Sequence, residues 1–410
     1  MGYTKNTISG FSWQTVLRIA SMGVVLIKTM FIARILSPND FGLFALIAIA
    51  LGIAEATTET GVNLTIIQSK SSIKYFIDTA WVIAIIRGFF IGILMVIMGI
   101  LMSKFYNESS LTILIALAAL VPVIKGFINP SIILFHKNLE FFKDSLFRFS
   151  IVVFEAGATV LFAYLFRSVS ALILGLLAAG VFEVFLSFVI FSDKPTFNYM
   201  SNRAKVIFSN AKGLSISAAL SYINQNVDDF ILGKTIGLHS LGLYHNAYSL
   251  GHKTNHDFAK SAHHSFLPVF TKIVDDTVRI KKAFIKSFSV TTILIVGLSL
   301  PLLIAPEFFI SIILGSQWLS LTPYLYLFVL AGILQSIAIL FYSLFFAQKK
   351  YSVINSHLAF TVIVLIALLL VLPQRFGIAG AGIALVTSRF VTLPILFLRA
   401  YSTLFKGDTK

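Results

Sequence analysis

The chain has 410 residues, of which 57% are hydrophobic and 12% are charged, and its mean hydropathy is +0.91. A soluble domain carries about 25% charged residues, so this composition excludes an ordinary soluble protein and indicates an integral membrane protein. The formal net charge is +15 and there are no cysteines, which excludes disulfides, thiolate chemistry and Cys-based metal sites.

Apolar segments of about 20 residues, the length that crosses roughly 30 Å of hydrocarbon, recur along the chain. We predict an all-α protein with about twelve membrane-spanning helices, at residues 13–34, 41–64, 79–102, 111–135, 146–167, 170–191, 207–231, 240–266, 287–305, 320–346, 354–372 and 378–401. An additional short helix is an alternative interpretation of 302–315. We divide the chain into an N-terminal six-helix lobe (1–195), a cytoplasmic linker (196–206) and a C-terminal six-helix lobe (207–410).

The Lys and Arg residues of the predicted loops indicate the orientation of these spans. With a cytoplasmic N-terminus, most loop bases lie on the cytoplasmic side, whereas the opposite face holds Arg34, Lys104, Arg167, Lys234 and Arg375. An even number of spans keeps both termini on the basic, cytoplasmic side. The net positive charge therefore reflects membrane topology, and no compact basic domain indicates a nucleic-acid partner.

One predicted span carries far more charge than a lipid-facing helix tolerates. The segment Ser240–Phe266 contains His252, Lys253, His256, Asp257, Lys260, His263 and His264. An ionisable group at bilayer depth is costly unless it faces protein or a water-filled cavity. Removing this span would also invert the loops that follow and scramble the charge bias. We therefore predict that it stays in the membrane and lines a polar cavity.

The charged span has a counterpart in the first half of the chain. Gly42-Leu43-Phe44 aligns without gaps with Gly242-Leu243-Tyr244, and Phe31–Arg34 aligns with Ile231–Lys234. In both copies a hydrophobic helix ends in a base, and a Gly-Leu-aromatic triplet opens the next helix. This pattern indicates two duplicated halves, a common plan for transporters. Two unrelated helix starts are the alternative.

Helical spacing places several of the polar residues on one face. His252, His256 and Lys260 are each four residues apart, with Lys253 and Asp257 beside them, and Glu55 and Glu59 form the equivalent stripe in the first half. Bases that line a low-dielectric cleft attract anions, and pyrophosphate or sugar-acid groups are obvious candidates.

A zinc site at His252 and His256 is the alternative interpretation of that face. The glutamate of the HExxH pattern is missing, and the neighbouring lysine opposes a cation, so we predict no metal. The chain also lacks a Gly-rich phosphate loop, so we predict no ATPase of its own and no cofactor.

Other charges at membrane depth have structural interpretations. We expect Arg87 or Lys125 to pair with Glu155 or Glu183 inside the first bundle. Arg18, Arg148 and Arg389 could reach a membrane interface with their long side chains. Lys28 is harder to explain in this way, because it lies two thirds of the way through the first span.

Short motifs along most of the chain resemble a known family. They are Gly10-Phe-Ser-Trp13, Ala33-Arg-Ile-Leu-Ser-Pro38-Asn-Asp-Phe41-Gly42, Asp229-Phe-Ile-Leu-Gly233, Leu241-Gly-Leu-Tyr244-His-Asn-Ala-Tyr248, Leu267-Pro268-Val-Phe and Ile313-Leu-Gly315-Ser-Gln-Trp318. Their order and spacing are similar to those of Wzx-like polysaccharide flippases, in the multidrug/oligosaccharidyl-lipid/polysaccharide (MOP) exporter superfamily.

The resemblance implies two six-helix lobes, related by pseudo-twofold symmetry, around a central cationic cavity. It also implies a protein of the bacterial cytoplasmic membrane that is not an enzyme and works as a monomer. Such a protein moves oligosaccharides linked to undecaprenyl pyrophosphate across the bilayer by alternating access, for surface polysaccharides such as lipopolysaccharide or exopolysaccharide. Relatives carry essential bases in the first and eighth spans, which implies substrate binding by Arg18, Lys28, Lys253 and Lys260. The polar stripe on the charged span adds His252 and His256 to the predicted substrate-binding residues. A proton or sodium gradient would supply the energy, with Glu55, Glu59, Asp228, Asp229 and Asp257 as ion-coupling candidates.

Two other functions are compatible with a polytopic membrane protein. A drug/cation antiporter of the same superfamily would share the fold but favour an acidic cavity, whereas the predicted spans hold more bases than acids. A membrane-bound polymerase or ligase would need acceptor-handling residues on the outer face, where the predicted loops are short.

Overall fold

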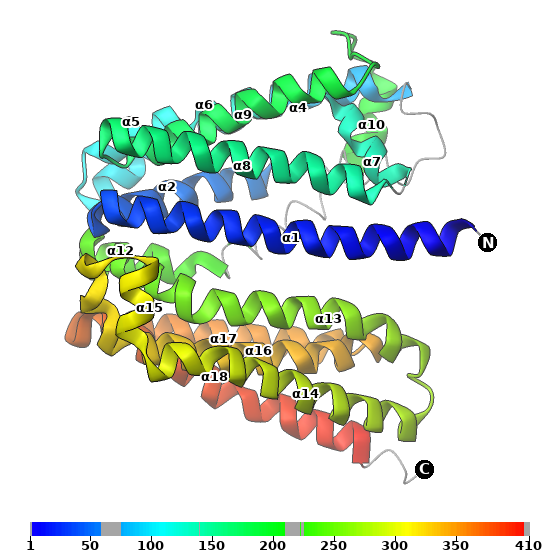
Figure 1. The fold of residues 1–410 in the computed structure, drawn as a ribbon, viewed down its shortest axis with the longest axis vertical. Coiled ribbons are helices and arrows are strands. Elements are labelled where there is room, and N and C mark those ends of the chain that lie inside the picture. Colours follow the sequence, from blue (N-terminus) through cyan, green and yellow to red (C-terminus); the bar gives the residue numbers. More distant parts are fainter. Residues whose placement is uncertain (1, 59–74, 139, 210–221, 223–224, 406–410) are drawn as a thin grey trace. The chain divides into compact units, whose positions relative to one another are not determined.

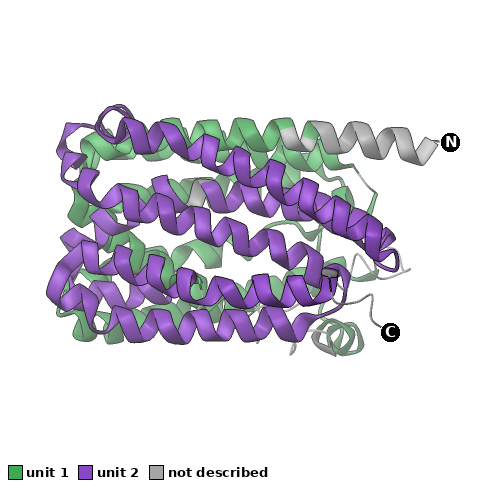
Figure 2. Ribbon diagram, turned by 90° about the horizontal axis from the view of Figure 1, so that it is seen from below, with its two compact units in different colours: residues 1–226 green, residues 227–410 purple. Residues whose placement is uncertain are grey.

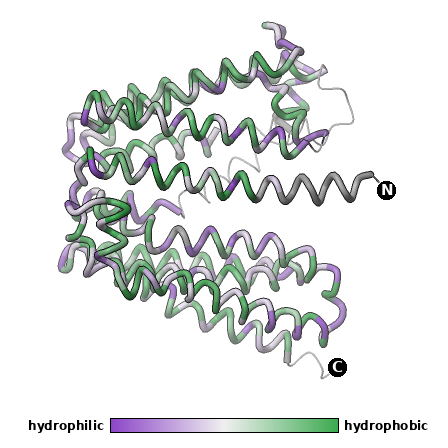
Figure 3. Tube along the Cα trace, in the orientation of Figure 1, coloured by the Kyte–Doolittle hydropathy of each residue, from purple (hydrophilic) through white to green (hydrophobic). Residues whose placement is uncertain are grey.

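A computed structural model describes residues 2–58, 75–138, 140–209, 222 and 225–405. Within these ranges the regular structure is helical and no strand is formed. The chain separates into two compact units, residues 1–226 and 227–410 (Figure 2). Hydrophobic residues predominate along most helices of both units (Figure 3).

The first unit contains the helices coloured blue to green in Figure 1. They are α1 (Gly2–Ile35), α2 (Pro38–Thr57), α4 (Ile77–Tyr106), α5 (Ser110–Ala118), α6 (Leu120–Lys125), the 3-10 turn η2 (Pro130–Ile132), α7 (Ile133–Lys137), α8 (Phe141–Phe166), α9 (Ser170–Ile190) and α10 (Ser201–Ser209). Within this unit α8 lies between α1 and α9, while α4 packs on α2, α5 and α6.

Local sequence explains where the second helix begins. The hydroxyl of Ser37 accepts a hydrogen bond from the backbone N–H of Asp40, whose carboxylate accepts one from the N–H of Ser37, and Pro38 occupies the first turn. This capping box satisfies N–H groups that have no partner within the helix. The other carboxylate oxygen of Asp40 accepts a hydrogen bond of 3.1 Å from the N–H of Val169, which joins the starts of α2 and α9.

The fourth predicted span is not one continuous helix. Instead of a helix over 111–135, the chain forms α5 and α6 and then η2 and α7, with a bend of 68° between the two parts. The bend follows Asn129, which is extended because a proline comes next and disfavours the α conformation before it. The Asn129 side chain donates a hydrogen bond of 2.9 Å to the carbonyl of Asp193, in the segment that follows α9. This bond fixes the position of the break.

The second unit contains the helices coloured green to red in Figure 1. They are α12 (Gly237–Tyr248), the π-helical turn η3 (Ser249–Lys253), α13 (Thr254–Lys272), α14 (Thr277–Ile304), α15 (Pro306–Ile313), the 3-10 turn η4 (Ser316–Leu321), α16 (Thr322–Ala347), α17 (Tyr351–Leu369) and α18 (Leu372–Phe405). The central helix is α16, which packs against η3, α13, α14 and α18. Its buried residues form one hydrophobic core with Phe270, Phe284 and Leu396.

Nine helices in the described part are long and apolar enough to cross a membrane, and the bent pair 110–125 with 130–137 adds a tenth. Two predicted spans are not among them. About half of 207–231 lies outside the described residues, and 240–266 is helical but is not among the helices long and apolar enough to cross a membrane. The helix α15 confirms the alternative interpretation of 302–315 as a short extra helix.

The predicted linker 196–206 packs against the first unit. Asp78 of α4 accepts hydrogen bonds from the N–H and the hydroxyl of Thr196, at 2.6 and 3.0 Å. Ala204 and Ile207 of α10 are buried against Phe76 at the start of α4. The two compact units divide at 226/227, and the predicted lobes and linker stay predictions. Because the seventh span is mostly outside the described residues, its assignment to the C-terminal lobe stays a prediction.

Candidate functional site

The charged segment Ser240–Phe266 lies inside the second unit and packs along α16. It runs through α12, η3 and α13 without a break in helical structure (Figures 1 and 3). A Cβ added to Gly251 would lie 2.9 Å from the backbone nitrogen of Val329 and 3.1 Å from the carbonyl carbon of Phe328. The absence of a side chain at Gly251 therefore lets the charged helix approach the backbone of α16.

The π-helical turn changes which residues of this helix face the core. A π turn contains one residue more than an α turn and is frequent at functional sites. Tyr244, Tyr248, His252 and His256 form a continuous ladder of rings, with centroid separations of 5.9, 4.3 and 5.6 Å. Tyr244 and His252 are buried deep in the unit, whereas Tyr248 and His256 are half-buried.

The predicted polar stripe is therefore split between two environments. His252 is only 2% exposed, and its ring nitrogens have no hydrogen-bond partner among the described residues. His256, Asp257 and Lys260 are half-buried and remain accessible within the second unit. The side chain of Lys253 lies outside the described part of the structure. Of the predicted ligands on this helix, His256 and Lys260 have partly exposed side chains, whereas His252 is buried.

The two adjacent acids before α12 are buried beside this ladder. The phenol of Tyr244 donates a hydrogen bond of 2.5 Å to Oδ2 of Asp228. The ring Nδ1 of His245 lies 3.2 Å from Oδ2 of Asp229. Both carboxylates are less than 10% exposed. The alternative that these acids carry a coupling ion stays open, but each already has a protein partner.

A base that we expected at the membrane interface belongs to the same buried region. Arg389 of α18 donates from Nε to the side-chain oxygen of Gln335 at 3.1 Å and interacts electrostatically with Asp228, Tyr248 and His252. Its Nη1 is buried and has no hydrogen-bond partner among the described residues. The sequence interpretation of Arg389 as an interfacial side chain is therefore wrong, because the packing of α18 on α16 turns the guanidinium inward.

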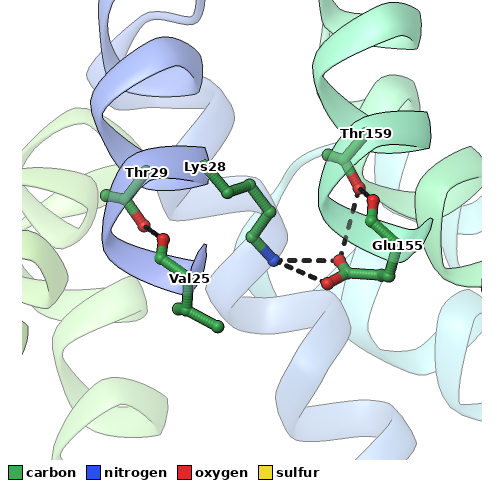
Figure 4. A network of polar contacts seen from close by, with 5 residues as sticks. All are labelled: Val25, Lys28, Thr29, Glu155 and Thr159. Atoms are coloured by element: carbon green, nitrogen blue, oxygen red, sulfur yellow. Dashed lines mark hydrogen bonds and ion pairs between the residues drawn. The ribbon is translucent and has the colours of Figure 1, made fainter. Parts of the chain in front are cut away.

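In the first unit, Lys28 forms an ion pair that we did not predict. Its Nζ lies 2.9 Å from Oε1 and 3.0 Å from Oε2 of Glu155 on α8 (Figure 4). The other predicted ligand on α1, Arg18, has an exposed side chain. Glu155 was recognised as an acid at membrane depth, but only the packing of α1 on α8 identifies Lys28 as its partner.

The remaining charges of the first unit also differ in part from expectation. Arg87 of α4 donates from Nε to the carbonyl of Thr58 at 2.7 Å and from Nη2 to the carbonyl of Glu55 at 2.9 Å. It therefore caps the end of α2 instead of pairing with an acid of α8 or α9. Lys125 and Arg148 are the bases that interact electrostatically with Glu183, in line with the pairing expected for Lys125.

The ion-coupling candidates are scattered over different elements. Glu55 is half-buried near the end of α2, and Glu59 lies outside the described residues. Asp257 is half-buried on α13, and its backbone carbonyl accepts a hydrogen bond from Ser261. Among the described residues, no three His, Asp or Glu side chains gather as a set of metal ligands.

Taken together, the apolar spans in two helical units, with ionisable side chains held inside each unit, define a multi-pass α-helical membrane protein. The fold agrees with two solved structures. One is a lipid II flippase, MurJ, in an inward closed conformation (TM-score 0.71, 14% identity, 94% of this chain and 87% of that chain). The other is an inward-facing multidrug resistance MATE transporter of the MOP superfamily (TM-score 0.69, 14% identity, 96% and 99%).

Sequence comparison identifies the family. Residues 31–323 match the family described as polysaccharide biosynthesis protein, and the chain belongs to this family. It is 24% identical to the lipopolysaccharide biosynthesis protein WzxC of Escherichia coli, over 98% of this chain and 80% of WzxC. It is 20% identical to the teichuronic acid biosynthesis protein TuaB of Bacillus subtilis, over 81% of this chain and 69% of TuaB. The resemblance to Wzx-like members of the MOP superfamily and the predicted fold class, an all-α membrane protein of about twelve spans in two lobes, are confirmed.

Proposed function

We propose that the protein is a flippase that carries polyprenyl-pyrophosphate-linked oligosaccharide repeat units across the bacterial cytoplasmic membrane. The proposal is supported by membership of the polysaccharide biosynthesis family and by the similarity of the fold to that of MurJ, a lipid II flippase. The protein acts by alternating access and catalyses no covalent step. The sugar and pyrophosphate enter a polar pathway from the cytoplasm while the polyprenyl tail remains in lipid.

One structural observation carries the choice of an anionic substrate. The charged segment from α12 to α13 is retained in the packed bundle of the second unit, with His256 and Lys260 half-buried on α13. Bases at this depth are costly in a lipid environment unless a polar solute or a protein partner compensates them. A pyrophosphate group offers several acceptor oxygens and two or more negative charges, so it would compensate them. Lys28 and Arg18 on α1, and Lys253 beside His252, complete the proposed set.

We propose that both termini are cytoplasmic, because this orientation follows the distribution of Lys and Arg over the loops. Transport is driven by a proton or sodium gradient, and the protein works as a monomer. The substrate lipid is of the undecaprenyl pyrophosphate type.

A second candidate, export of cationic drugs in exchange for an ion, is favoured by the buried acids Asp228 and Asp229 and by the agreement with the MATE fold. These carboxylates have Tyr244 and His245 as partners and Arg389 in electrostatic range of Asp228. One carboxylate oxygen of each acid is therefore already occupied by a protein partner, and the positive charge of Arg389 opposes an organic cation at Asp228. The flippase therefore agrees better with the charges of the second unit.

The decisive experiment measures lipid-linked glycan in a strain that lacks the gene. Undecaprenyl-pyrophosphate oligosaccharide on the cytoplasmic side is quantified after return of the wild-type gene or of the double variant Lys253→Ala, Lys260→Ala. The matched control is Lys282→Ala, Lys286→Ala, because these two lysines are exposed on α14. Protein level in the membrane is measured for each.

Accumulation that the wild-type and control genes relieve, and that the Lys253, Lys260 variant does not, supports the flippase and the role of the basic helix. Full relief of the accumulation by the Lys253, Lys260 variant would contradict a role of the basic helix in transport. No accumulation in the deletion strain, with a gain of sensitivity to cationic dyes, would move the protein to the antiporter branch.

A further inference from the structure

The ion pair of Lys28 and Glu155 joins two helices that both cross the membrane. Lys28 lies in the apolar part of α1 (Val16–Ile35), and Glu155 lies near the middle of α8. Figure 4 shows the ammonium directed at both carboxylate oxygens, at 2.9 and 3.0 Å. The side chains are 18% and 16% exposed, so the pair is largely shielded but can be reached by a solute.

The carboxylate is held in place from its other side. The hydroxyl of Thr159 donates to the backbone carbonyl of Glu155 at 2.7 Å and lies 3.3 Å from Oε1 (Figure 4). Thr159 is fully buried, and a Cβ on Gly175 of α9 would lie 1.9 Å from its hydroxyl oxygen. The packing of α8 on α9 thus fixes Glu155, whereas Lys28 has a flexible four-carbon stem and is the partner that can move.

The other charges on the helices around Glu155 are engaged elsewhere or exposed. On α8, Asp144 pairs with Arg148, and Lys143 pairs with Glu140. On α9 the titratable group is Glu183, whose interacting bases are Lys125 and Arg148. On α7, His136 is next to Lys137 in the chain and lies 3.3 Å from Asp144. On α1, the guanidinium of Arg34 donates to the carbonyl of Met30, and Arg18 is exposed. Among the described residues, Lys28 is the base within hydrogen-bonding distance of Glu155.

Two arrangements of this site avoid an uncompensated charge. In the first, the ammonium of Lys28 stays on the Glu155 carboxylate, as observed. In the second, Lys28 binds an anion and Glu155 has become neutral by accepting a proton. An intermediate arrangement, with Lys28 on the anion and Glu155 ionised, leaves a shielded carboxylate without a counterion and is strongly unfavourable. Anion binding and proton uptake are therefore linked.

We propose that Glu155 is a positioning residue that couples anion binding by Lys28 to the uptake of one proton. The inference rests on the proposed function, in which the anion is a pyrophosphate carried on a polyprenyl lipid. The ion pair opens, the ammonium of Lys28 keeps its three protons and contacts a phosphate oxygen, and Glu155 takes one proton from water. Release of the anion reverses each change, so the pair closes and the proton leaves.

The test is the pH dependence of binding, with undecaprenyl pyrophosphate as the probe and the full-length protein in lipid nanodiscs. Affinity is measured over a pH range on the order of 5.5 to 8.5. Proton uptake on mixing is measured in weak buffer with a pH dye. The phosphates of the probe also titrate, so the informative quantity is the difference between wild type and Glu155→Gln. The matched control is Glu140→Gln, at the residue that precedes α8, in the exposed pair with Lys143.

We expect the affinity of the wild type to rise with falling pH by up to about tenfold per unit more than that of Glu155→Gln, the limit for linkage to one proton. Glu155→Gln binds more tightly than wild type at high pH and takes up less than the wild-type amount of protons on binding. Glu140→Gln behaves as the wild type. Lys28→Gln binds more weakly at every pH.

Equal pH slopes and equal proton uptake for the wild type and Glu155→Gln would overturn the inference. An unchanged affinity of Lys28→Gln would overturn it as well. Either result would leave the proposed function standing. A wild-type protein that binds no undecaprenyl pyrophosphate at any pH would overturn both. If Glu155→Gln does not fold, the double variant Lys28→Gln, Glu155→Gln replaces it, since it leaves no unpaired charge. It must then bind weakly with the same flattened pH dependence, and a wild-type slope in this variant would refute the coupling.

Discussion

Gly332 of α16 and Gly251 of the π-helical turn cross so closely that neither position has room for a side chain. A Cβ on Gly332 would lie 2.8 Å from the carbonyl oxygen of Gly251 and 2.8 Å from the Cα of His252. These opposing atoms belong to the backbone, so no side-chain rotation can relieve the contact. The crossing allows a helix with many ionisable residues to pack along the most buried helix of the second unit.

Gly332→Ala should therefore destabilise the second unit. Forcing an extra methyl group into a packed crossing costs about 1–3 kcal/mol. The measurement is the thermal unfolding midpoint of the purified protein in detergent. Gly297→Ala on α14 is the control, because its added Cβ would meet no atom within 4 Å. The control should unfold at or slightly above the wild-type temperature, since Ala favours a helix over Gly by about 1 kcal/mol. Equal midpoints for the two variants would contradict the crossing.

Tyr244→Phe should destabilise the same unit through a different interaction. The variant removes the hydroxyl that donates to the buried carboxylate of Asp228 at 2.5 Å. Leaving a buried acceptor without its donor costs about 1–3 kcal/mol, and more when the acceptor is charged. Tyr326→Phe serves as the control, because Tyr326 is 44% exposed on α16. The double variant Tyr244→Phe, Asp228→Asn should recover part of the loss, because an amide is less costly to bury than a carboxylate. Absence of recovery would show that Asp228 is not the partner affected.

Arg87→Gln should loosen the end of α2 more than it affects the rest of the chain. The guanidinium donates to the carbonyls of Thr58 and Glu55 at the end of α2, where the last carbonyls of a helix lack a partner within it. Hydrogen bonds of charged groups contribute about 1.5–3 kcal/mol. Hydrogen exchange of the amides in α2 should speed up by tenfold or more, while exchange in α16 stays unchanged. Lys104→Gln, at the exposed end of the same helix α4, is the control. Equal exchange in both variants would argue against the cap.

Arg389→Lys should reduce stability and transport although it preserves the charge. Arg389 donates from Nε to Gln335 and also interacts with Tyr248, and an ammonium cannot reproduce the planar donor arrangement of a guanidinium. We expect a loss of about 1–3 kcal/mol, comparable to other buried hydrogen-bond deletions. Arg399→Lys, exposed further along α18, should change neither property. Stability is measured by thermal unfolding and transport by relief of lipid-linked glycan accumulation. Wild-type stability and transport in Arg389→Lys would support the interfacial role that the sequence suggested for Arg389.

Much of the fold could be predicted from hydropathy, because a bilayer demands long apolar helices. The spans at 79–102, 146–167 and 354–372 correspond to α4, α8 and α17 within a few residues. The interruption at Asn129 was missed. The proline that follows was visible in the sequence, but the hydropathy of the segment stays high across the break.

The sequence identified most charged residues of the candidate site, but it did not identify which of them interact with one another. The charged residues of 240–266 were identified because loop charges require that helix to stay in the membrane, and the structure packs it on α16. The inward position of Arg389 and the partner of Lys28 were not identified. Both depend on how helices far apart in the sequence rotate against each other, and no local pattern encodes that rotation.

The sequence by itself determined that the chain is a polytopic helical membrane protein with ionisable groups at bilayer depth. Length, apolar periodicity and loop charge are properties of single segments, and each acts on the bilayer independently of its neighbours. Tertiary structure alone decided which of these groups neutralise one another. Glu155 is 127 positions from Lys28 in the chain, and only the packing of α1 on α8 brings their charges to 2.9 Å. Such a pair depends on distance in space, which is why the acid that balances a proposed ligand emerged from the fold.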